Sequence, residues 1–380
     1  MKTCTILLAL STAWVSSVLA QSMPMQTMSG LLRLVRTSPL PSEGYMDHMT
    51  VDVNGQRLFI CGEANKSLIV VDLRSGKVIH ETKGLGGNPR KPFYLAESNE
   101  VWTDLGDNTV VAISGTTYQV TKTVALTGGR GNPTREPDSA AYDPARHLYY
   151  AAVLSKPGLA DGTIEIVDTK AAKLVGSIKM DAADPGGLSI EPSGKRLYAV
   201  IGDLVGGESH VKVMDLEKRA VIAEWPIIGG PVPHASGLDA ANHRLFIGSR
   251  IQPAPKGARI SSGHRYEPGK FVVINTDTGK VVQALDSVGG ADEVQYDVPS
   301  KRIYFVGTTG TLQVFKQIDP DHYISLGKVP TGAIAKTGLW VPQLQRMYVA
   351  VPKHIVQTPP YGPNDYITEE ARLMTFEFLP

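Results

Sequence analysis

The sequence predicts an all-β protein, a seven-bladed β-propeller closed by an N-terminal strand in the last blade. Three observations lead to this prediction: a short aromatic strand recurs along the chain, an alternating strand with a turn follows it, and one leading strand has no blade of its own. The recurring strand begins at Arg57, Glu100, His147, Arg196, Arg244, Arg302 and Arg346, so successive copies start 43 to 58 residues apart. This period fits one four-stranded propeller blade.

The N-terminus has the pattern of a secretory signal peptide over residues 1–20. Lys2 precedes an apolar run from Ile6 to Ala20, and the small residues before Gln21 predict cleavage after about Ala20. The run is too short and too weakly flanked for a membrane anchor. We therefore expect a secreted or periplasmic protein with a short segment at 21–30 and a single propeller domain at 31–380.

Charge and cysteine content narrow the expected partners. The chain has 38 Lys and Arg against 37 Asp and Glu and no basic cluster after the signal, so neither nucleic acid nor an anionic membrane is an expected partner. Once Cys4 leaves with the signal, Cys61 is the only cysteine, and no internal disulfide can form. We expect a monomer stabilised by burial alone. The tripeptide Asn65-Lys66-Ser67 is a glycosylation sequon if the source is eukaryotic.

Each unit reads in the same order. A short apolar strand and a turn lead into the recurring strand, and a variable loop then leads to a third strand with period-two alternation, as at 68–72, 164–168, 211–215 and 271–275. The next turn joins that strand to an outer strand as a hairpin. The last unit has strands at 337–341, 346–351 and 372–378 but no outer strand, so residues 31–36 are predicted to supply it and close the ring.

Two short motifs carry a family resemblance. The recurring strand reads Arg346-Met347-Tyr348-Val349 in the last unit, and a third strand ends in the turn Thr278-Gly279-Lys280-Val281. This pattern resembles the YVTN-repeat seven-bladed propellers, secreted or periplasmic proteins with a lactonase-like propeller shape. The resemblance covers residues 31–380 and implies the fold and the compartment, without a particular activity.

Polar residues at one register of the innermost strands form a candidate site. Five positions before each turn residue stand Asp47 beside His48, Arg90 or Lys91, Asp138, Gly186, His234, Asp292 beside Glu293, and Lys336. Because the strands are otherwise apolar, these charges are expected to face water in the channel. His48, His234, Asp138, Asp292 and Glu293 are the candidate catalytic residues, as an acid–base set or as ligands of a divalent metal ion. The alternative is that they cap turns and solvate an empty channel.

Long loops are expected to build a funnel over the same end of the channel. They span 127–137, 156–162, 251–269 and 352–371, lengths that favour a functional role. Arginines suit an anionic ligand and tyrosines supply apolar walls. The candidate ligand-binding residues are Lys91, Arg135, Arg250, Arg265, Tyr266, Lys336 and His354.

Three classes of function stay open at this point. The leading one is binding of a small organic molecule, anionic or neutral, in the top-face funnel. The second is an enzyme, namely a lyase, lactone hydrolase or cyclising isomerase, that uses the same residues. The third is a protein-interaction platform. The sequence has no haem-attachment, paired-cysteine zinc, phosphate-loop or nucleophile-elbow motif, so a divalent metal ion is the one cofactor left open.

Overall fold

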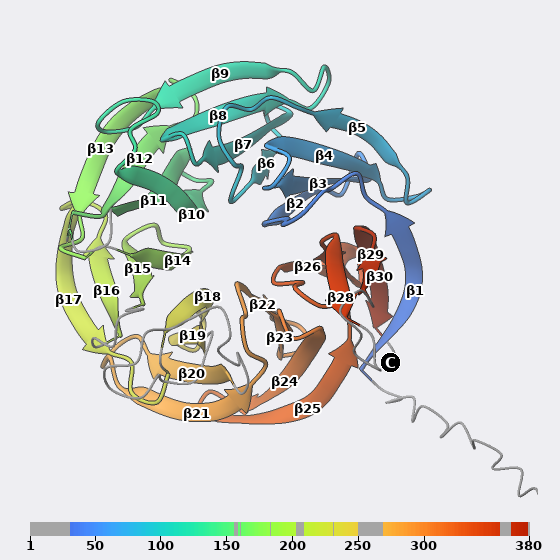
Figure 1. Cartoon of the computed structure of the whole chain (residues 1–380). Coiled ribbons are helices and arrows are strands. Elements are labelled where there is room, and N and C mark those ends of the chain that lie inside the picture. The colour runs from blue at the N-terminus through green and yellow to red at the C-terminus, as the bar shows by residue number, and fades with distance from the viewer. Residues whose placement is uncertain are drawn as a thin grey trace, which may run out of the picture.

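Seven four-stranded antiparallel sheets stand as blades in a ring, with the innermost strand of each blade nearest the central axis (Figure 1). The computed structural model describes residues 31–155, 159, 161–182, 184–202, 209–230, 232–249, 269–357 and 366–378. The predicted fold class is confirmed. The predicted signal peptide at 1–20, the segment at 21–30 and three candidate ligand-binding residues, Arg250, Arg265 and Tyr266, lie outside the described residues.

Blades 1 to 4 follow one another along the chain, each running from the channel outward. Blade 1 contains β2 (Met49–Asp52), β3 (Arg57–Gly62), β4 (Ser67–Asp72) and β5 (Val78–Thr82). Blade 2 contains β6 (Phe93–Leu95), β7 (Glu100–Leu105), β8 (Thr109–Ser114) and β9 (Val120–Ala125). Blade 3 contains β10 (Arg135–Asp143), β11 (Leu148–Ser155), β12 (Thr163–Asp168) and β13 (Lys173–Lys179). Blade 4 contains β14 (Pro185–Ile190), β15 (Arg196–Ile201), β16 (His210–Asp215) and β17 (Ala220–Pro226).

The remaining blades complete the ring. Blade 5 contains β18 (Pro233–Asp239), β19 (Arg244–Ser249), β20 (Gly269–Asn275) and β21 (Val281–Ser287). Blade 6 contains β22 (Glu293–Asp297), β23 (Arg302–Gly307), β24 (Thr311–Asp319) and β25 (His322–Pro330). Blade 7 contains β26 (Gly338–Val341), the 3-10 turn η1 (Pro342–Leu344), β27 (Arg346–Val351) and β30 (Arg372–Phe378), and its loop forms an additional hairpin of β28 (His354–Gln357) and β29 (Tyr366–Glu369). Within these ranges, no helix has the length and hydropathy that a membrane crossing requires.

Period-two alternation gives each blade two apolar faces. On β3, Leu58 and Ile60 pack against blade 7, whereas Phe59 and Cys61 pack against blade 2. A cluster of this kind fills the space between every pair of neighbouring blades, and most of its members are fully buried. The core is therefore a set of blade interfaces, which leaves the inner strands free to carry polar groups along the channel.

The predicted closing strand is observed. β1 (Leu32–Pro39) pairs antiparallel with β30 at the outside of blade 7, so the first and last strands of the described chain lie side by side (Figure 1). The strand also contacts blade 1, because the Arg36 guanidinium donates hydrogen bonds to the carbonyls of Leu73 and Arg74 at 3.0 Å. Closure thus removes the free sheet edge and joins the first blade to the last.

Two glycines of blade 1 allow a test of this contact, one in the turn between β4 and β5 and one after β5. Gly76 and Gly84 both adopt a φ of +73°, but a Cβ at Gly76 would lie 2.6 Å from Arg36 Cδ and from Ser38 Oγ, whereas a Cβ at Gly84 would have nothing within 4 Å. We expect Gly84→Ala to lower the free energy of unfolding by about 1 kcal/mol through backbone strain. Gly76→Ala should lower it by about 2 kcal/mol, because it also displaces the closing strand. Urea unfolding measures both, and equal losses would contradict the contact.

Candidate functional site at the channel mouth

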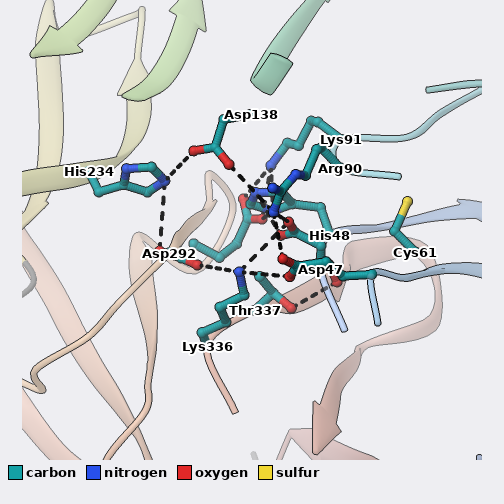
Figure 2. Close-up of polar contacts among 12 residues, drawn as sticks. Asp47, His48, Cys61, Arg90, Lys91, Asp138, His234, Asp292, Lys336 and Thr337 are labelled. Carbon is teal, nitrogen blue, oxygen red and sulfur yellow. Dashed lines mark hydrogen bonds and ion pairs between the residues drawn. The ribbon is translucent and has the colours of Figure 1, made fainter. Parts of the chain in front are cut away.

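The seven inner strands begin at the same end of the central axis, and we call this end the channel mouth. The residues that the sequence places at one register meet there (Figure 2). Six ring positions bring a charged or imidazole side chain to this end, and the exception is Gly186 in blade 4. Asp47, His48, His234, Asp292 and Glu293 are all at most 7% exposed, so these residues form a buried polar network.

β-Bulges aim several of these side chains. The pairing register of the inner strand shifts between Pro137 and Ser139 and between Pro233 and Ala235, so that Asp138 and His234 each stand at the centre of a bulge. Blade 4 has the corresponding shift after Pro185. A bulge bends the strand and redirects the residue at its centre, and bulges are frequent beside functional sites. Proline suits the preceding position, because a ladder hydrogen bond is lost there anyway.

These prolines are a sequence feature that our reasoning missed. Pro89, Pro137, Pro185 and Pro233 each precede a ring position, and they stand 48 residues apart along the chain. A proline repeated at the blade period marks where each ladder is interrupted. The same spacing would have fixed the register of blade 2, where the sequence pattern left Arg90 and Lys91 as alternatives.

The first group of contacts, the His48 cluster, consists of His48, Lys91 and Glu293. His48 Nδ1 is in hydrogen-bonding contact with Glu293 Oε2 and lies 3.1 Å from Lys91 Nζ. Lys91 Nζ donates to Glu293 Oε1 and Oε2 at 3.0 and 2.9 Å. Burial alone would raise the pKa of Glu293, but the charges of Lys91 and His48 outweigh it and lower that pKa to about 2. Glu293 is therefore a permanent carboxylate at neutral pH.

The second group, the His234 cluster, consists of His234, Asp138 and Asp292. His234 Nε2 lies 3.7 Å from Asp138 Oδ2 and 3.7 Å from Asp292 Oδ1, so the imidazole stands between two carboxylates (Figure 2). The gap at Gly186 accommodates this ring, since a Cβ there would lie 3.0 Å from His234 Nδ1. A larger residue in blade 4 would push the imidazole out of place.

Arg90 and Lys336 connect the two clusters through Asp47, whose Oδ1 lies 3.5 Å from His48 Nε2 and whose Oδ2 lies 3.4 Å from Arg90. Arg90 donates to Glu63 at 2.7 Å and to Glu136 at 2.5 Å and lies 3.6 Å from Asp138. Burial disfavours the charged form of Arg90, but Asp138, Asp47 and Glu63 more than compensate and raise its pKa above the ordinary value.

Lys336 forms the second connection, from blade 7. Lys336 Nζ lies 3.0 Å from Asp292 and 3.7 Å from Asp47. Its neighbour Thr337 donates through Oγ1 to the carbonyl of Asp47 at 3.0 Å. One network of alternating charge therefore spans the mouth from blade 1 to blade 7.

Two candidate ligand-binding residues lie outside this network. The Arg135 guanidinium is held by β12, through the Thr163 hydroxyl and through Glu165 Oε1 at 3.2 Å. His354 is buried in the hairpin of blade 7, where Nδ1 lies 2.9 Å from the carbonyl of Pro352 and Nε2 lies 3.6 Å from Glu369. The structure thus brings Lys91 and Lys336 to the channel mouth but gives Arg135 and His354 other partners.

The two histidines belong to separate clusters rather than to one shared centre. Among the described residues, no three His, Cys, Asp or Glu side chains are grouped in a way that could hold a metal ion. The arrangement instead offers two imidazoles, each with carboxylates within 4 Å, which suits hydrogen bonding and proton transfer. The divalent metal ion stays a prediction from the sequence.

Comparison with known proteins defines the class of the fold. Hydrazine synthase of Kuenenia stuttgartiensis superposes with a TM-score of 0.66 at 16% sequence identity, over 87% of this chain and 97% of that one. A chain of a mitotic checkpoint complex superposes with a TM-score of 0.67 at 12% identity, over 100% of both chains. At these identities the likeness concerns the fold alone, and the chain is a seven-bladed β-propeller.

Sequence comparisons add no family to this class. No protein-family model matches the chain, and no curated protein matches it. Membership of the YVTN-repeat family therefore stays a prediction.

Proposed function

We propose that the protein binds a small polar organic molecule at the channel mouth. The observation that carries the proposal is that ionisable groups from six blades meet at the channel mouth, and those of blades 1, 2, 5 and 6 are buried there. These groups lie apart from the hydrophobic core, because apolar clusters fill every blade interface. Burying charge is costly even when it is paired, and such clusters are candidates for functional sites.

The accessible members of the network indicate the kind of ligand. The side chains of Lys91 and Lys336 are 20% and 18% exposed, whereas those of His48 and Asp292 are 5% and 4% exposed. A ligand that enters the mouth therefore reaches these two ammonium groups, together with the carboxylates of Glu136 and Asp138 (51% and 22% exposed), before it reaches the buried imidazole and carboxylate. A carboxylate on the ligand would contact these ammonium groups well. We favour a small organic anion for this reason.

Three fragments that differ only in one terminal group test the proposal. We expect phenylacetate to bind in saturation-transfer NMR, and the neutral phenylacetamide and the cationic phenethylamine to bind more weakly. Lys336→Ala should reduce phenylacetate affinity at least ~10-fold, since a charge-assisted hydrogen bond contributes about 1.5–3 kcal/mol. Lys122→Ala, which removes a lysine paired with Glu100 in blade 2, is the matched control and should leave affinity unchanged. Equal binding of all three fragments, or equal loss in both variants, would contradict the proposal.

An enzyme that uses the same mouth is the second candidate. It is favoured by the carboxylate contacts of both imidazoles, because a carboxylate beside an imidazole fixes its tautomer and orientation for acid–base catalysis. The reaction classes that fit are those the sequence left open, namely a lyase, a lactone hydrolase or a cyclising isomerase. Turnover of a lactone panel that is lost in His234→Ala, with the melting temperature retained, would distinguish this enzyme from a binding protein.

A further inference from the structure

A buried carboxylate outside the ring contacts the segment that carries Arg90 and Lys91. Asp104, on β7, is fully buried. Its Oδ1 accepts a hydrogen bond from the Lys91 N–H at 2.9 Å and lies 2.7 Å from the Tyr149 hydroxyl oxygen. Its main-chain carbonyl accepts the Arg90 N–H at 3.1 Å. Asp104 therefore receives both main-chain N–H groups of the Arg90-Lys91 pair.

Tyr149 completes the contact from blade 3. Its hydroxyl accepts the Asp104 N–H at 3.0 Å, and its single proton has two acceptors within reach, Asp104 Oδ1 and the Lys91 carbonyl, each at 2.7 Å. The Tyr149 ring is itself fixed, because it is fully buried and packs edge-on against Phe93 at a centroid distance of 5.6 Å. The hydroxyl thus has a defined position between blades 2 and 3.

The sequence around Lys91 makes these contacts necessary. Pro89 and Pro92 flank the Arg90-Lys91 pair and have no N–H groups, so the pair holds the only main-chain donors of this stretch. Only an isolated bridge between Pro89 and Leu105 precedes β6, which starts at Phe93. With little ladder pairing here, Asp104 and Tyr149 supply most of the hydrogen bonds that fix the direction in which Lys91 leaves the chain.

We propose that Asp104 and Tyr149 form a positioning pair, which holds the main chain of Arg90 and Lys91 and so places the Lys91 ammonium against His48 and Glu293. The effect of this pair on ligand affinity rests on the proposed function, whereas its effect on the position of Lys91 does not. Neither residue reaches the ligand in this proposal. Both act through Lys91, whose ammonium contacts Glu293 at 2.9 Å.

The Glu293 carboxyl reports the position of Lys91 without any ligand. Because the Lys91 charge contributes most to the lowering of the Glu293 pKa, a displaced Lys91 must raise that pKa. Carbon NMR of proteins labelled at glutamate side chains measures it. In the wild-type protein, Glu293 should stay ionised to about pH 3. In Tyr149→Phe and Asp104→Ala, its midpoint should rise by about one unit or more.

Two further variants separate positioning from general damage. Asp104→Asn keeps an oxygen acceptor for the Lys91 N–H, so Glu293 should titrate in this variant as it does in the wild-type protein and not as in Asp104→Ala. Tyr150→Phe removes the next hydroxyl on β11, whose ring packs in the opposite blade interface, and should leave the titration unchanged. If Tyr149→Phe does not fold, the comparison of Asp104→Ala with Asp104→Asn gives the same answer.

Phenylacetate affinity separates this inference from the proposed function. The affinity for phenylacetate should fall about 10-fold in Tyr149→Phe and should keep the wild-type value in Asp104→Asn. A raised Glu293 pKa in a protein that binds no phenylacetate would support the positioning pair and count against the proposed function. An unchanged Glu293 titration in both Tyr149→Phe and Asp104→Ala would overturn the positioning pair, whatever binds.

Discussion

A Lys91→Met protein is expected to lose about 3 kcal/mol of unfolding free energy at pH 7, because its Glu293 carboxylate stays buried without its strongest cationic partner. The folded pKa of Glu293, about 2, lies below the ordinary value of 4.5. The ionised group therefore stabilises the fold above pH 4.5, and this contribution disappears as the pH falls toward 2. The loss caused by Lys91→Met should shrink over the same window.

Urea unfolding at pH 7 and pH 3 measures this change. Lys83→Met is the matched control, because Lys83 pairs with Glu81 at 3.1 Å but its side chain is 72% exposed. Solvent screening makes such a surface pair contribute at most about 1 kcal/mol. A loss for Lys91→Met that is the same at both pH values would mean that packing of the lysine stem, rather than the ion pair, stabilises the protein.

The sequence predicts the fold closely because local periodicity determines it. The strand predicted at 31–36 is observed as β1, Leu32–Pro39, and the last third strand begins and ends at Arg372 and Phe378 as predicted. Alternation assigns each residue to a blade interface, and turn residues separate the strands. The hairpin of β28 and β29 was not predicted, because it lies in a loop with no counterpart in the other units.

The ring positions could be predicted for the same reason, whereas their partners could not. Counting from each turn places Asp47, His234 and Lys336 at one register. Which groups pair depends on closure of the ring, and this brings His48 and Glu293 together across 245 residues of sequence.

Side-chain direction was the second limit on prediction. Arg135 lies at the mouth end of β10, but its long side chain points to β12, where its guanidinium donates a hydrogen bond to Glu165. The role of Tyr149 was not predicted, because the pattern indicates only that an aromatic residue of the recurring strand packs in the core. The partners of its hydroxyl depend on the neighbouring blade.

An Asp104→Asn protein should be more stable than the wild type at pH 7.5, by about 3 kcal/mol at most. Burial raises the pKa of Asp104 to about 6 from the ordinary 3.8, and its Oδ2 has no hydrogen-bond partner among the described residues. The folded protein therefore holds this proton more tightly than the unfolded chain does. The contribution of Asp104 to the free energy of unfolding of the wild-type protein therefore falls as the pH rises from about 4 to about 6.

Asparagine removes this titration while its oxygen still accepts the Lys91 N–H, so the gain should be present at pH 7.5 and absent at pH 4. The titratable and charged groups that face Asp104 are Arg90, Tyr149 and Cys61. Of these, the Arg90 cation favours the ionised carboxylate, which is why we give 3 kcal/mol as an upper value. Urea unfolding at the two pH values measures the difference. A variant less stable than the wild type at pH 7.5 would show that the Asp104 charge stabilises Arg90 by more than its burial costs.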